Sequence, residues 1–484
     1  MSGIIGIVIA LALLMYLAFR GISVLILGPL MAIVAVLIAG GLPILATYTQ
    51  IFMQSTGDFI ILFFPLFILG AIFGKLMDDS GSAQSIARWS VSKLGAQRSI
   101  LAVVLSCAVL TYGGVSLFVV AFAVYPVAAS LFREADIPKR LIPATIALGS
   151  FTFTMTALPG TPAIQNAIPM PFFGTTPFAA PGLGMITALV MFALGNLWVS
   201  RQAAKASVAG EGYGDHEDAA PVPDKQMREH AEGEGFDVME LGAPPPDKDK
   251  LPCFMLAIAP VLIVILVNLV SIKFVIPAMD TAYLSDPLFG PTTIESVRGI
   301  WAIIIALMVS IVFVAAVNWR RLVSPKQSID DGANASVLPI FNTASLVGFG
   351  AVIAALPAFD RVRDAVLGIG GDNPLISLAV AVNVLAGMTG SASGGMSIAL
   401  DNLGDIYVAM AQNAGVSLDL MHRVTSVATG GLDSLPHNGA VITLLAITGL
   451  THREAYKDIF MVAVLFPILA LILLIMLGSF FGSF

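Results

Sequence analysis

Charged residues are scarce in this chain of 484 residues. Asp, Glu, Lys and Arg make up only 11% of the sequence, whereas hydrophobic residues make up 57%, and the mean hydropathy is +0.92. Soluble domains carry about 25% charged residues, so an ordinary soluble protein is excluded. The long apolar runs, for example 4–19, 24–38, 59–73 and 254–270, instead predict a multi-pass integral membrane protein surrounded by lipid.

The sequence also has few features of other protein classes. It contains two cysteines, Cys107 and Cys253, both in or beside apolar runs, so we expect no disulfide framework. No basic patch indicates a nucleic-acid partner. No Lys or Arg precedes Arg20, so the basic region of a signal peptide is missing, and the first apolar run is expected to remain as a membrane helix. The expected location is the inner (cytoplasmic) membrane.

Motifs of catalysis and of metal binding are missing as well. The chain contains no Gly-x-x-x-x-Gly-Lys phosphate loop and no Gly-x-Ser-x-Gly nucleophile elbow. Four histidines have no metal-ligand spacing, and we interpret them as loop or boundary residues: His216, His230, His422 and His452. We therefore expect neither an enzyme nor an ATP-driven pump, and no cofactor or metal.

Two apolar runs are interrupted in the same way, about 280 residues apart. Residues 111–116 (Thr-Tyr-Gly-Gly-Val-Ser) interrupt one run, and 391–397 (Ser-Ala-Ser-Gly-Gly-Met-Ser) interrupt the other. Each is followed by a second break at a proline, in 158–162 and 435–439. Within hydrocarbon, unwound backbone survives only where protein or a watered cavity satisfies its polar groups. Paired breaks in two halves therefore predict a secondary transporter with its binding site at the breaks.

The distribution of basic residues indicates that the two halves are inverted. In the first half, Lys and Arg gather in 75–98, and none occurs in 41–56. In the second half they gather at 319–326, the position equivalent to that empty loop, whereas 355–374 carries more Asp than Arg. Short loops rich in Lys and Arg stay cytoplasmic, so the two repeats are expected to face opposite sides of the membrane.

These patterns predict an all-α inverted-repeat transporter with about ten transmembrane helices, two re-entrant hairpins and two broken helices. The first repeat spans 1–200, with scaffold helices in 1–75, an interfacial helix near 78–96, a hairpin at 99–131 and a broken helix at 140–170. The second repeat spans 251–484, with scaffold helices in 252–356, a hairpin at 374–403 and a broken helix at 421–449. Between them, residues 201–250 hold 12 Asp or Glu and 6 Lys or Arg, and are expected to form a flexible acidic cytoplasmic loop.

The expected binding site uses the helix ends that the breaks create. A new helix amino terminus exposes unpaired N–H groups and a positive dipole end, and four such ends can converge to bind an anion. This matters because the apolar runs contain no well-buried Lys or Arg to hold a carboxylate. We expect a small organic anion with hydroxyl groups, bound by Thr111, Gly113, Gly114, Ser116, Gly160, Thr161, Asn166, Ser391, Ser393, Gly394, Gly395 and Asn438.

Two ionisable residues at the second proline break are the candidates for proton coupling. An Asp at the bilayer centre costs about 2.5–3.5 kcal/mol, so Asp433 is expected to have a role. His437 lies four residues further on, close enough to share a cavity, and histidine changes charge near neutral pH. The alternative is that His437 only donates a hydrogen bond to a backbone carbonyl at the break.

Residues 432–443 (Leu-Asp-Ser-Leu-Pro-His-Asn-Gly-Ala-Val-Ile-Thr) and the duplicated Gly-Gly hairpins resemble the gluconate permease family, within the ion transporter superfamily of inverted-repeat carriers. The resemblance covers nearly the whole chain except 201–250. It implies a homodimer with a static scaffold and a mobile, elevator-type domain. It also implies proton-coupled symport of gluconate or 3-hydroxybutyrate. The Ser-Asn-Thr signature of sodium-coupled dicarboxylate relatives is replaced by 112–114 (Tyr-Gly-Gly) and 392–394 (Ala-Ser-Gly).

Three other functions remain open from the sequence. A sodium-coupled or citrate-type carboxylate carrier has the same architecture. A membrane-embedded enzyme would need a convergent acid, base and nucleophile, and only Asp433 and His437 come near one. A channel would show a continuous polar stripe, whereas polarity here is confined to the breaks.

Overall fold

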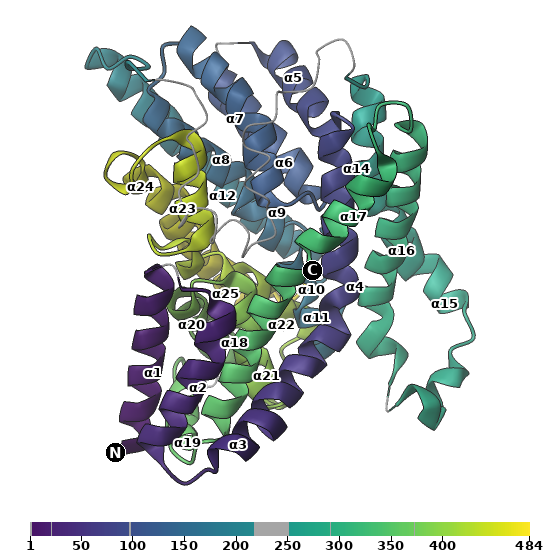
Figure 1. Ribbon diagram of the computed structural model, residues 1–484, viewed down its shortest axis with the longest axis vertical. Helices are drawn as coiled ribbons and strands as arrows, with labels where there is room; N and C mark the ends of the chain where they lie inside the picture. Colours follow the sequence, from purple (N-terminus) through teal and green to yellow (C-terminus); the bar gives the residue numbers. More distant parts are fainter. Residues whose placement is uncertain (1, 21, 96–97, 217–250, 291, 372) are drawn as a thin grey trace.

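The computed structural model describes residues 2–20, 22–95, 98–216, 251–290, 292–371 and 373–484 (Figure 1). Within these ranges the chain is helical and has no β-strand. Six helices are long and apolar enough to cross a membrane: Ile44–Asp79, Pro181–Val208, Phe254–Ala278, Ile294–Val317, Pro325–Ala355 and His452–Phe481. Five shorter apolar helices accompany them, including Val24–Ala39 and Ser99–Tyr112. The expectation of an all-helical membrane protein is thus confirmed.

The first half begins with helices that lie beside one another. Helix α1 (Ser2–Phe19) packs against α2 (Val24–Ala39). A long third helix follows, in which α3 (Ile44–Ala46), the π-helical turn η1 (Thr47–Phe52) and α4 (Met53–Asp79) are continuous. Helix α5 (Ser82–Leu94), expected as an interfacial helix, buries Ala83, Ile86 and Ala87 and packs on α6 (Ser99–Tyr112) and α14 (Phe254–Val270).

The rest of the first half contains both predicted breaks. Helices α6 (Ser99–Tyr112) and α7 (Leu117–Glu134) pack together and are joined by residues 113–116. The next run is divided into short helices around residues 157–163 before the long α12 begins. Its elements are η3 (Lys139–Leu141), α8 (Ile142–Ser150), α9 (Phe153–Thr156), α10 (Ile164–Ala167), α11 (Pro169–Phe173) and α12 (Pro181–Val208).

The second half has a similar order of elements. It begins with scaffold-like helices, which are α14 (Phe254–Val270), η6 (Ser271–Val275), α15 (Ile276–Ala278), η7 (Ala282–Ser285), η8 (Pro287–Phe289), α16 (Ile294–Val317), α17 (Pro325–Ala335), α18 (Val337–Ala355) and α19 (Phe359–Leu367). Paired and broken helices follow, namely α20 (Pro374–Thr389), α21 (Ala392–Ala414), α22 (Leu418–Thr429), η9 (Leu432–Ser434) and α23 (Gly439–Thr448). The last helix comprises α24 (His452–Phe460), η10 (Met461–Leu465) and α25 (Phe466–Phe481).

Two helices run further than the sequence predicted. The break expected at 391–397 is shorter than predicted, because α20 ends at Thr389 and α21 begins at Ala392, so residues 392–397 are helical. Helix α21 continues to Ala414 rather than stopping at 403, because Leu403, Tyr407 and Ala411 bury one face while Asp401 stays exposed on the other. Helix α12 continues to Val208, because residues 201–208 (Arg-Gln-Ala-Ala-Lys-Ala-Ser-Val) are mostly strong helix formers. The segment expected as a flexible loop from residue 201 therefore begins as helix.

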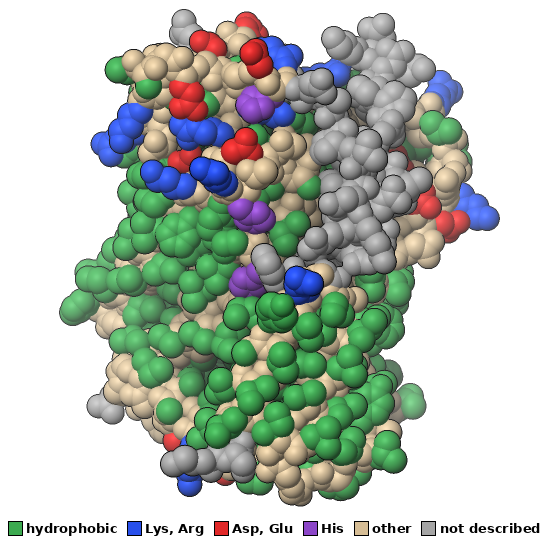
Figure 2. Space-filling model, turned by 60° about the vertical axis from the view of Figure 1, so that its left-hand side comes forward, with side chains coloured by type: hydrophobic (Ala, Val, Ile, Leu, Met, Phe, Trp, Pro, Cys, Tyr) green, Lys and Arg blue, Asp and Glu red, His purple; other side chains and the backbone are tan. Residues whose placement is uncertain are grey.

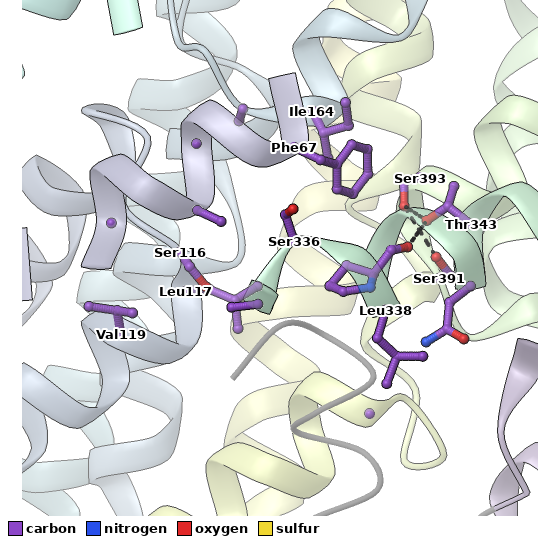
Figure 3. A pocket seen from close by; sticks show the side chains of 18 of the residues that line it. Phe67, Ser116, Leu117, Val119, Ile164, Ser336, Leu338, Thr343, Ser391 and Ser393 are labelled. Atoms are coloured by element: carbon purple, nitrogen blue, oxygen red, sulfur yellow. Dashed lines mark hydrogen bonds between the residues drawn. The ribbon is translucent and has the colours of Figure 1, made fainter. Parts of the chain in front are cut away.

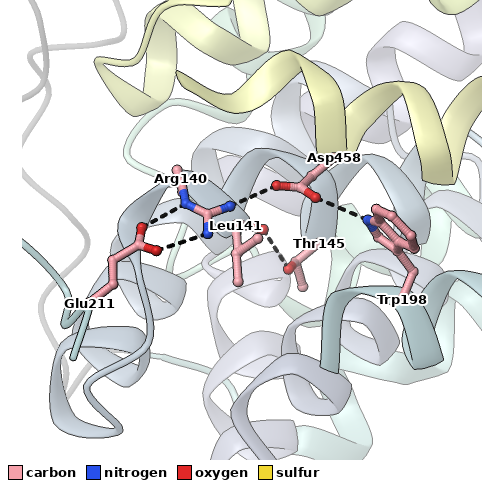
Figure 4. A network of polar contacts seen from close by, with 6 residues as sticks. All are labelled: Arg140, Leu141, Thr145, Trp198, Glu211 and Asp458. Carbon is pink, nitrogen blue, oxygen red and sulfur yellow. Dashed lines mark hydrogen bonds and ion pairs between the residues drawn. The ribbon is translucent and has the colours of Figure 1, made fainter. Parts of the chain in front are cut away.

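Residues that follow α12 are also fixed, by a polar network that Figure 4 shows. Arg140 Nε and Nη2 donate to the two carboxylate oxygens of Glu211 at 2.7 and 3.0 Å. Arg140 Nη1 donates to the buried Asp458 at 2.9 Å, which also accepts from Trp198 Nε1 at 3.0 Å. The backbone N–H of Tyr213 donates to an Asp136 oxygen at 3.0 Å. Hydrogen bonds thus hold the first part of the acidic segment in place as far as Tyr213. Its remainder, 217–250, lies outside the described residues.

The two helix pairs that flank the glycine-rich turns lie at opposite ends of the molecule. Figure 1 places α6 and α7 in its upper half and α20 and α21 in its lower half. On the face that Figure 2 presents, hydrophobic side chains cover the middle and lower parts, and charged side chains gather toward the upper end. Such a distribution is typical of a protein whose middle is surrounded by lipid.

Candidate functional site

A cavity of about 800 Å³ lies where the two glycine-rich turns and the two proline breaks meet. Figure 3 shows Ser116 and Leu117 on one side and Thr343, Ser391 and Ser393 on the other. Ligand pockets commonly measure about 300–1,000 Å³, so the space suits a small molecule. Segments from both halves of the chain are therefore needed to build one site.

Helix amino termini converge on this cavity. Ser116 immediately precedes α7, Ser391 precedes α21, and Gly439 begins α23, and all three residues line the cavity. The Ser391 side chain accepts a hydrogen bond from Gly394 N at 3.1 Å, which caps α21. These termini bring positive dipole ends to the cavity wall, which favours an anionic ligand.

Hydroxyl groups from the second half form a cluster at the cavity wall. Thr343 Oγ1 lies 3.3 Å from Ser393 Oγ, which in turn lies 3.4 Å from Ser391 Oγ (Figure 3). Because each hydroxyl can donate or accept, this cluster can rearrange to serve a carboxylate or a hydroxyl group of a ligand.

The predicted binding residues that line the cavity come from both turns. They are Thr111, Gly114, Ser116, Ser391 and Ser393, together with the predicted proton carrier His437. Gly114 has a φ of +93°, and a Cβ there would lie 2.7 Å from Pro162 Cγ. Only glycine fits this conformation without strain, which explains the glycine signal at the first turn.

Gln165 is a cavity residue that the sequence reasoning missed. It lies in the first turn of α10, directly after the break at Pro162, and only 9% of it is exposed. Its Oε1 has no hydrogen-bond partner among the described residues, and neither does Oγ1 of Thr111. The sequence did contain a signal for this residue, namely a polar amide three residues after a proline at a break. Such a residue lies in the first turn of the new helix, next to the break.

Comparison with known proteins identifies the family to which this chain belongs. No protein-family model matches the chain. The chain is 45% identical, over 469 residues and 96% of each protein, to a protein of Bacillus subtilis (strain 168) named "Uncharacterized transporter YxjC". This chain belongs to the YxjC transporter family. The family assignment confirms the prediction of a membrane transporter. It does not show membership of the gluconate permease family.

A solved structure shows the same fold as this YxjC-family transporter. It is described as "Structure and Function of Neisseria gonorrhoeae MtrF Illuminates a Class of Antimetabolite Efflux Pumps". The TM-score is 0.54, with 90% of this chain and 84% of that chain covered, at 12% identity. At so low an identity the likeness shows the fold alone.

Arg423 corrects the expectation that the apolar runs hold no well-buried cation. It lies within α22 and is fully buried, and it makes five hydrogen bonds of 2.8–3.3 Å. The acceptors are the backbone carbonyls of Thr156, Pro177 and Ala179 and the side-chain oxygen of Asn166. Since every acceptor belongs to the first half of this YxjC-family chain, Arg423 fixes the first proline break from across the molecule.

His422 was expected as a loop or boundary residue, and that interpretation is wrong. It is fully buried beside Arg423. Its Nε2 lies 3.2 Å from Asn166 Oδ1, and its Nδ1 lies 2.6 Å from the hydroxyl of Thr175. Because the amide oxygen only accepts, Nε2 carries the hydrogen and Nδ1 accepts from Thr175.

Asn166 and Thr161 were predicted to bind substrate, but neither lines the cavity. The Asn166 amide donates to the carbonyls of Thr161 and Pro177, at 3.0 Å each, while its oxygen accepts from Arg423 and His422. The side chain thus has no remaining capacity for a ligand. Thr161 is fully buried.

The remaining predicted glycines serve close packing rather than the cavity surface. A Cβ on Gly113 would lie 2.6 Å from Val261, and one on Gly394 or Gly395 would collide with Leu346 or the backbone of Ala386. Gly160 has a φ of +85° and faces the ring of Phe178. These glycines let helices and turns approach closely, which sequence alone could not separate from a binding role.

His437 and Asp433 lie in neighbouring spaces rather than in one. His437 lines the main cavity, and its Nε2 donates to the carbonyl of Gly387 at 2.9 Å. Asp433 lines a separate chamber of about 30 Å³, together with the predicted residue Asn438 and with Gln165. Asn438 caps α23 through Ala440 N at 2.7 Å and donates to the carbonyl of Gly390 at 2.8 Å. The second break is therefore attached to the turn between α20 and α21.

Proposed function

We propose that this transporter carries a small hydroxylated organic anion by proton-coupled symport, with the cavity at the four breaks as its binding site. The observation that carries the proposal is the convergence of three helix amino termini and the cluster of Thr343, Ser391 and Ser393 on one cavity. Lys75 also lines the cavity, but it forms an ion pair with Asp79 at 3.0 Å. Backbone N–H groups and hydroxyls are therefore the proposed ligands of the anion.

The proposed substrate is a gluconate- or 3-hydroxybutyrate-type acid, in keeping with the resemblance to the gluconate permease family. A hydroxylated acid matches a wall that combines positive helix ends with hydroxyl groups. Pockets built in this way bind a carboxylate without a cationic side chain, as broken helices of transporters do.

The proposed transport cycle uses the two halves as inverted repeats, 1–200 and 251–484, which together act as an elevator. The hairpins α6–α7 and α20–α21 would then open to opposite sides of the inner membrane, and 201–250 would lie in the cytoplasm. The similar order of elements in the two halves and the opposite placement of the hairpins support this proposal (Figure 1). A homodimer is part of the same proposal.

His437 is the proposed proton carrier, with Asp433 as a neighbouring acid. His437 lines the cavity and contacts the end of α20 through Gly387, so its charge can influence both ligand binding and the turn. Asp433 lies in the adjoining chamber, which shares Gln165 with the main cavity.

A ligand screen on the purified protein tests the proposed binding site. Gluconate, 3-hydroxybutyrate and related acids are added, and thermal unfolding is followed, because a ligand bound only by the folded state raises the midpoint. Ser393→Ala should weaken this stabilisation at least several-fold in apparent affinity. Ser397→Ala is the matched control, because Ser397 is buried in the same helix and does not line the cavity. Equal effects of the two substitutions, or no stabilisation by any acid, would contradict the proposal.

A further inference from the structure

Two buried oxygen atoms on the first-half side of the cavity have no partner. Thr111 is 3% exposed and Gln165 is 9% exposed, and both line the cavity. Thr111 Oγ1 and Gln165 Oε1 make no hydrogen bond within the part of the chain that the structure describes. Buried polar atoms are almost always paired, and leaving one unpaired destabilises the folded state. Their position at a cavity indicates that a bound molecule completes them.

Two other unpaired buried oxygens belong to residues that lie away from this cavity. Thr443 Oγ1 and Ser397 Oγ are equally without a partner among the described residues, yet neither residue lines the cavity. Thr111 and Gln165 therefore differ from them by belonging to the lining of a space large enough for a ligand. Thr443 serves below as a matched control.

The positions of Thr111 and Gln165 are fixed by their neighbours. Tyr112, next to Thr111, donates its hydroxyl to the carbonyl of Pro159 at 2.7 Å, which ties the first turn to the first break. Asn166, next to Gln165, is held by Arg423 at 3.1 Å and by His422 at 3.2 Å. Groups held in this way are prepared for a ligand before it arrives, which favours discrimination between similar molecules.

The chemistry of the pair suits a hydroxyl group. Gln165 Oε1 can only accept a hydrogen bond, whereas the Thr111 hydroxyl can donate as well as accept. A ligand hydroxyl can donate to Gln165 and accept from Thr111 at the same time. A carboxylate would satisfy Thr111 but would face the Gln165 oxygen with a second acceptor.

We propose that Thr111 and Gln165 bind a hydroxyl group of the transported acid, while its carboxylate lies toward Ser391, Ser393 and the amino terminus of α21. The pair thus selects hydroxy acids over acids that lack the hydroxyl. This inference rests on the proposed function of the cavity. Sites built to hydrogen-bond a substrate hydroxyl reject the analogue without it strongly, because their polar groups are then left unpaired.

Isothermal titration calorimetry on the purified full-length protein tests the inference with two matched ligand pairs. These are 3-hydroxybutyrate against butyrate, and gluconate against hexanoate. The wild type should prefer the hydroxylated member of at least one pair by about tenfold or more. Thr111→Val and Gln165→Met should each reduce the preference to about threefold or less, through weaker binding of the hydroxy acid. Thr443→Val should keep the wild-type preference.

The outcomes separate the inference from the proposed function. If the wild type binds none of the four acids, both are overturned. If it binds hydroxy acids and both cavity variants keep the wild-type preference, only the inference is overturned. Folding of each variant is checked by its thermal midpoint without ligand, which should not fall, because each substitution removes an unpaired buried oxygen.

Discussion

At the scale of single residues, Arg423 links the second half of the chain to the first proline break. A fully buried guanidinium is held by three backbone carbonyls and one amide oxygen, all from residues 156–179. Those residues leave the helical hydrogen-bond pattern at the first proline break, so their carbonyls need donors within the membrane. Arg423 supplies five N–H groups in a planar arrangement that can reach several acceptors at once.

Replacing Arg423 by Lys should destabilise the protein severely. A lysine ammonium cannot reach the same four acceptors, and each buried acceptor left without a donor costs about 1–3 kcal/mol. We expect the midpoint of thermal unfolding in detergent, measured by circular dichroism, to fall by several degrees or more. Arg320→Lys is the control, because Arg320 lies in the loop between α16 and α17. This substitution should leave the midpoint unchanged. A stable Arg423→Lys protein would show that the break does not depend on this side chain.

Gly114 offers a second test at the residue scale. Alanine at a φ of +93° is strained by about 1–2 kcal/mol, and its Cβ would also lie 2.7 Å from Pro162 Cγ. Gly114→Ala should therefore lower the thermal midpoint and reduce transport. Gly57→Ala, in the interior of α4 with no atom within 4 Å of the added Cβ, should leave the midpoint unchanged or raise it slightly. The idea fails if the two variants behave alike.

At the scale of elements, the sequence located the first glycine-rich break and both proline breaks, but it placed the other break at 391–397, whereas the structure has it at 390–391. Pro and Gly punctuate an apolar run locally, so the interruptions at 113–116 and 430–438 could be found without tertiary information. The extension of α21 to Ala414 was missed, because the buried face formed by Leu403, Tyr407 and Ala411 continues past the charged Asp401. The polar residues there favoured a helix end, whereas the packing of the buried face favours a longer helix.

The roles of residues at the breaks were harder to predict than the breaks themselves. Gly114 faces the cavity, whereas Gly394 and Gly395 face neighbouring helices, although both pairs look alike in sequence. His422 was misread and Arg423 was missed, since their surroundings are built by segments more than 200 residues away. Such contacts have no local signature.

The network around Arg140 makes a prediction about pH. Its hydrogen bond to Glu211 lowers the pKa of that carboxyl below the usual 4.5. A carboxyl with a lowered pKa stabilises the folded form above its ordinary pKa, and this contribution is lost as the pH falls from 4.5 through the lowered value. Residues 209–216 should therefore lose hydrogen-exchange protection in that acid range. The Glu211 side chain is 44% exposed and screened by solvent, so we expect the effect to be confined to this segment.

Two variants separate this network from general acid unfolding. Glu211→Gln should show weak protection of 209–216 at every pH, because the charge-assisted hydrogen bond is gone. Asp215→Asn, in the same segment, should keep the wild-type dependence. Protection that is independent of residue 211 would refute the role of this ion pair.

At the scale of the whole molecule, the two halves of the chain build one site and stabilise each other. The cavity takes residues from both glycine-rich turns and both breaks, and Arg423 of the second half holds the break of the first. The sequence could predict the convergence, because paired breaks must be satisfied within the membrane. It could not predict the interlocking, which depends on how α22 packs against residues 156–179.

His437 should be required for concentrative transport but not for exchange. His437→Gln keeps a donor toward the Gly387 carbonyl but removes the titratable ring. Proteoliposomes with this variant should exchange labelled for unlabelled acid, yet fail to accumulate acid when a pH gradient is imposed. Gradient-driven accumulation at the wild-type level would remove His437 as the proton site and leave it a structural support of the break.

The proposed role of the cavity is to bind an organic acid that moves together with protons. Its most direct test is the uptake of labelled gluconate and 3-hydroxybutyrate into proteoliposomes under an imposed pH gradient, with a sodium gradient as the comparison. We expect accumulation of at least one of these acids that follows the pH gradient, is abolished by a protonophore and falls strongly in Ser393→Ala but not in Ser397→Ala. Accumulation that follows sodium and ignores the pH gradient, or uptake unaffected by Ser393→Ala, would contradict it.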